Sequence, residues 1–147
     1  MNQLQRLILH SDWANRTWLE FTFGDAGGEA YLARIISHVY LAEQVWFQRI
    51  YGEEVDKDIF TTRTPDELRE LMTSHQSRYA DIAVRDLNRI IAFRRFTGEA
   101  LESTIQDILL HLITHGAHHR GQMAAFASQS QLVPPNTDYL TFSRLSG

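Results

Sequence analysis

Apolar residues recur every three to four positions in four stretches of the chain, which is the spacing of one helix face. The first stretch predicts a helix over residues 2–23 that stops at Gly24. The second predicts a helix over residues 29–51, and Gly52 follows as a residue suited to the left-handed position after a helix. Two long helices joined by a short turn are therefore expected at the start of the chain.

The third helix is predicted by the clearest start signal in the sequence. Thr64 suits the N-cap, Pro65 fits the first helical position, and Glu67 completes a capping box. The apolar face that follows runs over residues 68–82 and includes His75. This histidine is therefore expected to point inward.

The helical period is lost over residues 89–97, which predicts a short extended segment before a turn at Gly98. Ser103 and Gln106 then form a second capping box. The last helix is expected to run from this point to about Ser130.

Two consecutive prolines, Pro134 and Pro135, separate this helix from a short tail that is expected to fold back over the helices. Four long helices with little strand predict an all-α fold, a four-helix bundle with a short extended segment before the last helix. Its 147 residues suit a single domain over residues 1–147.

The composition narrows the chemistry that the chain can perform. The net charge is −4, so no global field attracts nucleic acid, and no nucleic-acid partner is expected. No secretory leader and no apolar run of about 20 residues is seen, which predicts a cytoplasmic protein without membrane contact. Cysteine is absent, so disulfides and thiolate sites are excluded, and nitrogen or oxygen must hold any metal.

His115 and His119 are the most informative pair in the sequence, because they continue the apolar face predicted for the last helix. That face consists of Ile108, Leu112, His115, His119, Gln122 and Phe126. Residues four apart are separated by ~40° around a helix and by about 6 Å along it. Two imidazoles placed in this way can bind the same metal ion.

A third ligand has to come from another helix. His111 and His119 are about 12 Å apart along the axis, whereas a metal–nitrogen bond is only about 2.0–2.1 Å long. His38 and His75 both lie on or beside inward faces, so the spacing leaves both as candidates.

The ordinary alternative for an inward histidine is a core residue bonded to a backbone carbonyl or a carboxylate. His111 borders the apolar face and is a candidate for contacting a metal ligand or a bound molecule from outside. His10 and His118 are expected at the flank or surface.

The motifs of several other enzyme classes are missing from the sequence. There is no His-Glu-x-x-His, Glu-x-x-His repeat, Gly-x-Ser-x-Gly or phosphate-binding glycine loop.

Several segments together resemble the DinB-like family of metal-binding four-helix proteins. Residues 115–122 (HGAHHRGQ) and 134–138 (PPNTD) resemble the C-terminal signature of that family. Residues 38–46, a histidine followed by a tryptophan two turns later, resemble its second-helix motif. Residues 13–15 and 96–98 also fit, so the resemblance spans nearly the whole chain.

The resemblance implies a three-histidine site formed by His38, His115 and His119, and it favours His38 over His75. The implied cofactor is a divalent metal ion, with zinc or nickel expected first and iron or manganese as alternatives. The family also implies a homodimer, and some of its members are thiol-dependent S-transferases or isomerases.

Three neutral imidazoles leave a divalent ion with an open coordination position, which is the catalytic arrangement. Such an ion lowers the pKa of a bound water or thiol. Because the chain has no cysteine, a thiol would have to be a low-molecular-weight cosubstrate. We therefore expect a metalloenzyme, S-transferase or hydrolase, that activates a small thiol or water against a small electrophilic substrate.

Two polar residues beside the histidines have open roles. Arg120 is a candidate for orienting an anionic group, with a structural salt bridge as its alternative. Gln122 is a candidate for contacting a ligand or bound water, with a core hydrogen bond as its alternative. The alternative function is a non-catalytic metal-binding dimer with a stress-response or scaffold role. This alternative allows tail residues near Asp138 or Tyr139 to cover the open position of the ion.

Overall fold

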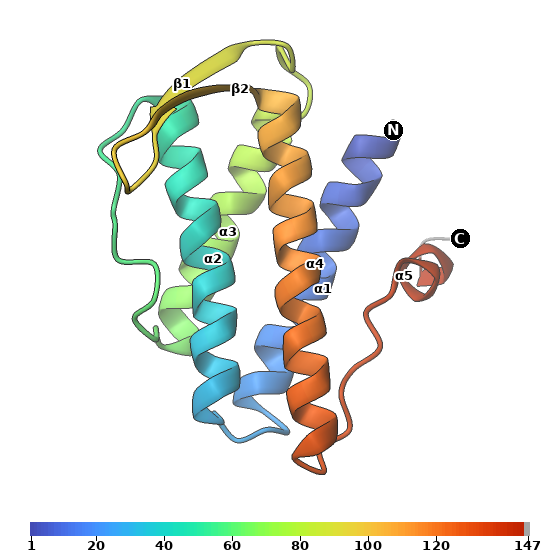
Figure 1. The fold of residues 1–147 in the computed structure, drawn as a ribbon. Helices are drawn as coiled ribbons and strands as arrows, with labels where there is room; N and C mark the ends of the chain where they lie inside the picture. The colour runs from blue at the N-terminus through green and yellow to red at the C-terminus, as the bar shows by residue number, and fades with distance from the viewer. Residues whose placement is uncertain (146–147) are drawn as a thin grey trace.

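The computed structural model describes residues 1–145 and is predominantly helical, as predicted. Four long helices lie side by side, and a two-stranded hairpin crosses one end of them (Figure 1). The elements in chain order are α1 (Gln3–Phe23), α2 (Ala30–Tyr51), α3 (Pro65–Ile82), β1 (Ile90–Arg94), β2 (Ala100–Thr104), α4 (Ile105–Gln129) and α5 (Tyr139–Leu145).

Local signals in the sequence place most helix ends correctly. Thr64 caps α3, and its side chain accepts from the backbone N–H of Glu67, whose side chain accepts from the backbone of Thr64. Gly52 ends α2 with a φ of 70°, in the left-handed region where glycine has no steric penalty. The capping box of α3 and the glycine end of α2 are therefore confirmed.

The predicted start of α4 is wrong by one residue. Thr104, not Ser103, is the N-cap, and its side chain accepts from the backbone N–H of Asp107. Ser103 lies within β2, where it pairs with Ile91 of β1. Because the strand pairing holds Ser103 in an extended conformation, the cap moves to the last residue of the strand.

The extended segment predicted before α4 is one strand of an antiparallel hairpin. β1 lies within the predicted residues 89–97, and Gly98 has a φ of 93° in the turn that follows. The second strand, β2, was not predicted. The hairpin lies where α2 ends and α4 begins (Figure 1), so it covers the end of the space between these two helices.

The tail after α4 folds back over the helices, as expected, and contains the short helix α5. It packs on α1, where Arg6 donates to the hydroxyl of Tyr139 and the Nε2 of His10 contacts the carbonyl of Thr137 at 2.8 Å. In Figure 1 this tail lies on the other side of α4 from α2.

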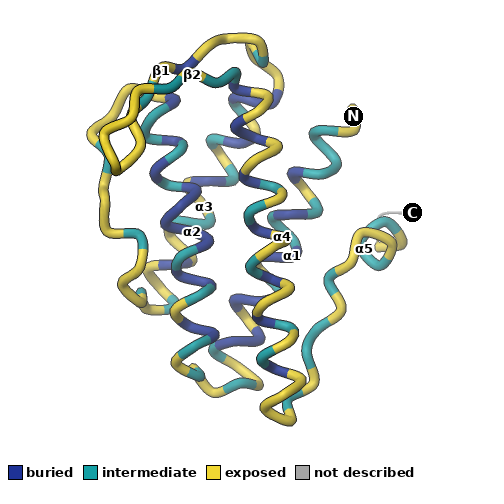
Figure 2. The backbone as a smooth tube through the Cα atoms, in the orientation of Figure 1, coloured by how far each residue is buried: buried dark blue, intermediate teal, exposed yellow. Residues whose placement is uncertain are grey.

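The core has two apolar clusters with a buried polar layer between them. Phe47 and Ile108 belong to the cluster at the hairpin end, and Trp18 and Met123 to the cluster at the other end. Figure 2 shows the buried positions on the helix sides that face one another. The buried polar layer consists of Ser11, Asn15, Glu43, His75 and Arg120. Within residues 1–145, no helix combines the length and apolarity that crossing a membrane requires.

Glu43 in this layer is the shared hydrogen-bond acceptor of two side chains of α3, His75 and Tyr79. The Nδ1 of His75 lies 3.3 Å from one carboxylate oxygen of Glu43, and the hydroxyl of Tyr79 donates to the other. Burial, with the nearby carboxylate of Glu43 as the next cause, raises the pKa of Tyr79 well above its usual value. Tyr79 therefore stays protonated and serves as a donor.

We expect Glu43→Ala to lower the free energy of unfolding by about 3 kcal/mol or more, because it leaves buried His75 and Tyr79 without their shared acceptor. Urea denaturation followed by circular dichroism measures this change. The matched control is Glu70→Ala, an exposed glutamate on α3, which is expected to change stability by no more than about 0.5 kcal/mol. Equal effects of the two substitutions would contradict a structural role for the layer.

Candidate metal centre

His38 of α2 and the pair His115 and His119 of α4 meet between these two helices. One ring nitrogen of each residue lies within 4.8 Å of those of the other two. The Nε2 atoms of His115 and His119 are 3.1 Å apart. Two ligands on a tetrahedral ion with bonds of about 2.05 Å would be about 3.4 Å apart, so this donor set fits a transition-metal ion.

Hydrogen bonds fix which nitrogen of two of these rings carries the proton. The Nδ1 of His38 donates to the carbonyl of Ile59 at 2.9 Å, since a carbonyl can only accept. The Nδ1 of His119 likewise donates to the amide oxygen of Gln122 at 2.7 Å. Both Nε2 atoms therefore keep a lone pair, and such outer-shell bonds are typical of histidine metal ligands.

The connection between α2 and α3 holds the ring of His38 in place. Phe60 stacks on it with ring centroids 4.9 Å apart and an interplanar angle of 3°. His115 and His119 approach the same ring edge-on, at centroid distances of 5.2 Å and 4.8 Å. His38 is thus fixed by a carbonyl behind it and an aromatic ring against its face.

The local electrostatics favour neutral imidazoles. Burial, followed by the neighbouring His119 and His38, lowers the pKa of His115 to about 3. Burial also lowers the pKa of His119. Neutral rings are the form that binds a cation, so the pair is ready to bind a metal at neutral pH.

The buried face of α4 differs from the predicted one. It runs through Ile105, Ile108, Leu109, Leu112, Gly116, Arg120, Met123 and Ala127. His115 and His119 lie at its border, partly buried, and Gln122 is exposed. The reason is that Gly116 and Arg120 occupy core positions without being apolar. The two histidines consequently face α2 rather than the centre of the core.

Arg120 points into the polar layer and donates to the side-chain oxygen of Asn15. Burial lowers its pKa to about 10, against the opposing effect of Glu43. A Cβ at position 116 would lie 2.9 Å from the Nη1 of Arg120, so Gly116 makes room for this side chain. Arg120 is thus bonded to a neutral amide, on the side of α4 that faces α1.

The other predicted residues have distinct positions. Gln122 is the hydrogen-bond partner of His119. The ring of His111 lies 5.7 Å from that of His115 and 5.6 Å from that of Trp46. His118 is exposed, as expected.

His75, the second candidate for a third ligand, lies outside the three-histidine group. Its Nδ1 is bonded to Glu43 in the polar layer, so it is a core histidine held by a carboxylate, while its buried Nε2 has no hydrogen-bond partner among residues 1–145. Ile59 and Phe60 were not assigned a role from the sequence, because they belong to a connection without regular structure and carry no metal-binding motif.

Comparison with known proteins places this chain in a family. The sequence model described as the DinB family matches residues 20–146, a range that contains all three histidines. Protein DinB of Bacillus subtilis (strain 168) is 23% identical over 119 residues, which cover 74% of this chain and 69% of that protein. The chain therefore belongs to the DinB family.

Proposed function

We propose that this protein is a metalloenzyme in which His38, His115 and His119 hold one divalent ion. The supporting observation is that their ring nitrogens converge, while two of the rings direct their protons to acceptors on the far side. Zinc or nickel is the proposed ion, with iron or manganese as alternatives. The four long helices are proposed to form the bundle fold of the family.

A divalent ion held by three protein ligands would act as a Lewis acid. It would lower the pKa of a bound water or thiol toward neutral pH. The chain contributes orientation: Ile59 fixes the ring of His38, and Gln122 fixes that of His119. Because the chain contains no cysteine, the thiol is a low-molecular-weight cosubstrate. The proposed reaction is the attack of this thiol, or of water, on a small electrophile.

The position of the tail supports an enzyme over a non-catalytic scaffold. The scaffold alternative allows tail residues near Asp138 or Tyr139 to cover the open position of the ion, whereas an enzyme needs that position free for a substrate. Tyr139 instead accepts a hydrogen bond from Arg6 of α1, and Asp138 accepts one from the backbone N–H of Thr141 in α5. The homodimer implied by the family resemblance stays a prediction.

We expect His115→Ala to lose most of its bound metal and to remain helical, because the apolar clusters do not include His115. Metal content after dialysis, measured by mass spectrometry, and circular dichroism test this expectation. His118→Ala, a change to an exposed neighbour, should keep the metal of the unaltered protein. Equal metal content in the two variants would exclude the proposed site.

Gln122→Ala is expected to weaken metal binding by about 10- to 100-fold without abolishing it, since it removes the acceptor that orients His119. Competition with a chromophoric chelator measures the affinity. Gln106→Ala, an exposed glutamine on the same helix, is the matched control and should bind like the unaltered protein. An unchanged affinity in Gln122→Ala would show that this hydrogen bond has no orienting role.

Turnover is tested with protein loaded separately with zinc, nickel, iron or manganese. A panel of small thiols and electrophiles is expected to give product with at least one ion, and His38→Ala should abolish it. Inactivity of every loaded form, despite tight metal retention, would support the scaffold alternative instead.

A further inference from the structure

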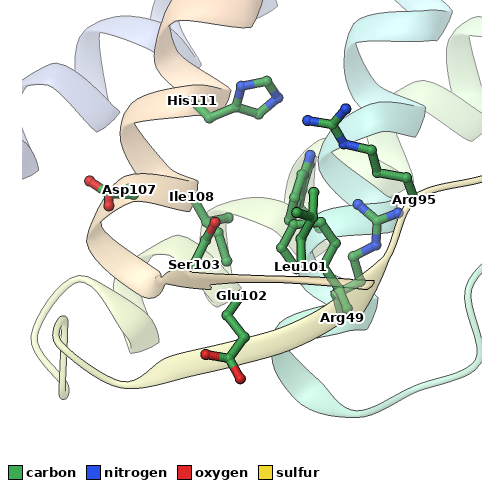
Figure 3. Close-up of a pocket in the computed structure, with 10 residues that line it drawn as sticks. Arg49, Arg95, Leu101, Glu102, Ser103, Asp107, Ile108 and His111 are labelled. Carbon is green, nitrogen blue, oxygen red and sulfur yellow. The ribbon is translucent and has the colours of Figure 1, made fainter. Parts of the chain in front are cut away.

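A pocket of about 520 Å³ lies beside the three-histidine centre, at the end of the molecule covered by the hairpin. This volume is within the range typical of sites for small molecules. Residues from α2, α4 and the hairpin line it (Figure 3), among them Trp46, Arg49, Phe93, Leu101, Ile108 and His111.

The pocket and the three-histidine centre lie along the same two helices. His111 lines the pocket, and its ring is 5.7 Å from that of His115, one turn or about 6 Å further along α4. On α2, Trp46 of the pocket follows His38 by eight residues, or about 12 Å. A small molecule in the pocket can therefore extend toward the three histidines.

Arg49 gives this pocket a cation that is paired with no carboxylate in the described part of the chain. Its guanidinium lies 4.4 Å from the ring centroid of Trp46 and 4.9 Å from that of Phe93, and it donates to the carbonyl of Arg94 at 2.9 Å. Among residues 1–145, no carboxylate lies within 4.0 Å of it. A partly buried guanidinium without a carboxylate partner is suited to bind an external anion.

The other charged residues of the pocket do not cancel this charge. Glu102 and Asp107 line the pocket, but Figure 3 shows their carboxylates pointing away from the guanidinium groups of Arg49 and Arg95. Arg95 adds a second, exposed cation, which is paired with Glu99 at 3.5 Å. The interior of the pocket thus combines one unpaired positive group with two aromatic walls.

We infer that this pocket binds a small organic carboxylic acid, which is the electrophilic substrate of the three-histidine centre. Its carboxylate pairs with Arg49, its apolar body packs on Trp46 and Phe93, and its far end passes His111 toward His115. A single guanidinium presents parallel N–H groups that match the two oxygens of a carboxylate. The substrate assignment rests on the proposed function, whereas binding of the acid to the pocket does not require the metal.

Phenylacetate and its neutral analogue phenylacetamide test this inference on the full chain, with and without metal. Nuclear magnetic resonance follows the indole N–H of Trp46, assigned with Trp46→Phe. We expect phenylacetate to shift this resonance and to bind at least about tenfold more tightly than phenylacetamide. Arg49→Gln should weaken phenylacetate binding by about 10- to 100-fold and leave phenylacetamide unaffected, because it removes a charged hydrogen-bond donor.

Arg34→Gln is the matched control, since Arg34 also lies over an aromatic ring of α2, that of Tyr31 at 5.6 Å, but outside the pocket. It should bind phenylacetate like the unaltered protein. Equal affinity for the acid and the amide, or no effect of Arg49→Gln, would overturn the inference.

The unaltered protein decides the question even where Arg49→Gln fails to fold. Phenylacetate must then shift the resonances of Trp46 and His111, and shifts confined to other parts of the chain would overturn the inference. The metal content of the same protein is measured in parallel, so that failure of acid binding can be told apart from failure of the proposed metal site. A protein that retains metal through His115 but does not discriminate the acid refutes the substrate class alone.

Discussion

The burial of Arg120 against Asn15 fixes how α4 is rotated about its axis. A buried guanidinium is costly without a partner, and the side-chain oxygen of Asn15 on α1 supplies one. His119 precedes Arg120 by one residue, or about 100° of rotation. Directing Arg120 toward α1 therefore turns His119, and His115 one turn before it, toward α2. The geometry of the three-histidine group therefore depends on the rotation of α4, which this polar contact sets together with the apolar residues of the same buried face.

Much of the fold is predictable because helix periodicity and caps are local properties of a sequence. The positions of the site residues are less predictable from the sequence, for two reasons. Gly116 and Arg120 lie in the core of the protein although neither has an apolar side chain. A prediction from apolar residues alone therefore placed the buried face of α4 too close to His115 and His119. His38 and His75 are both inward by spacing, and periodicity does not reveal their tertiary partners, a carbonyl and a carboxylate, which distinguish them in the structure. The family resemblance carried information that periodicity does not contain.

Helices supply the ligands of this centre, and connections supply their orientation. The connection between α2 and α3 fixes His38 through the carbonyl of Ile59 and the ring of Phe60. The hairpin between α3 and α4 forms a wall of the neighbouring pocket through Phe93. Both connections pack along the same pair of helices, so the lining of the pocket can change with them while the helices that carry the three histidines stay the same.

His75 and the three histidines between α2 and α4 differ in the hydrogen-bond partners that the fold gives them. His75 is buried beside a carboxylate, which occupies its Nδ1 and anchors it as part of the core. His38 and His119 instead direct Nδ1 to neutral acceptors, a carbonyl and an amide, and the Nε2 of His119 lies 3.1 Å from that of His115. A neutral carbonyl or amide does not stabilise a protonated imidazole as a carboxylate would. The ring nitrogens of the three histidines that carry lone pairs lie close together and are suited to bind a cation. The three histidines are therefore suited to hold a cation because their partners fix the rings without charging them.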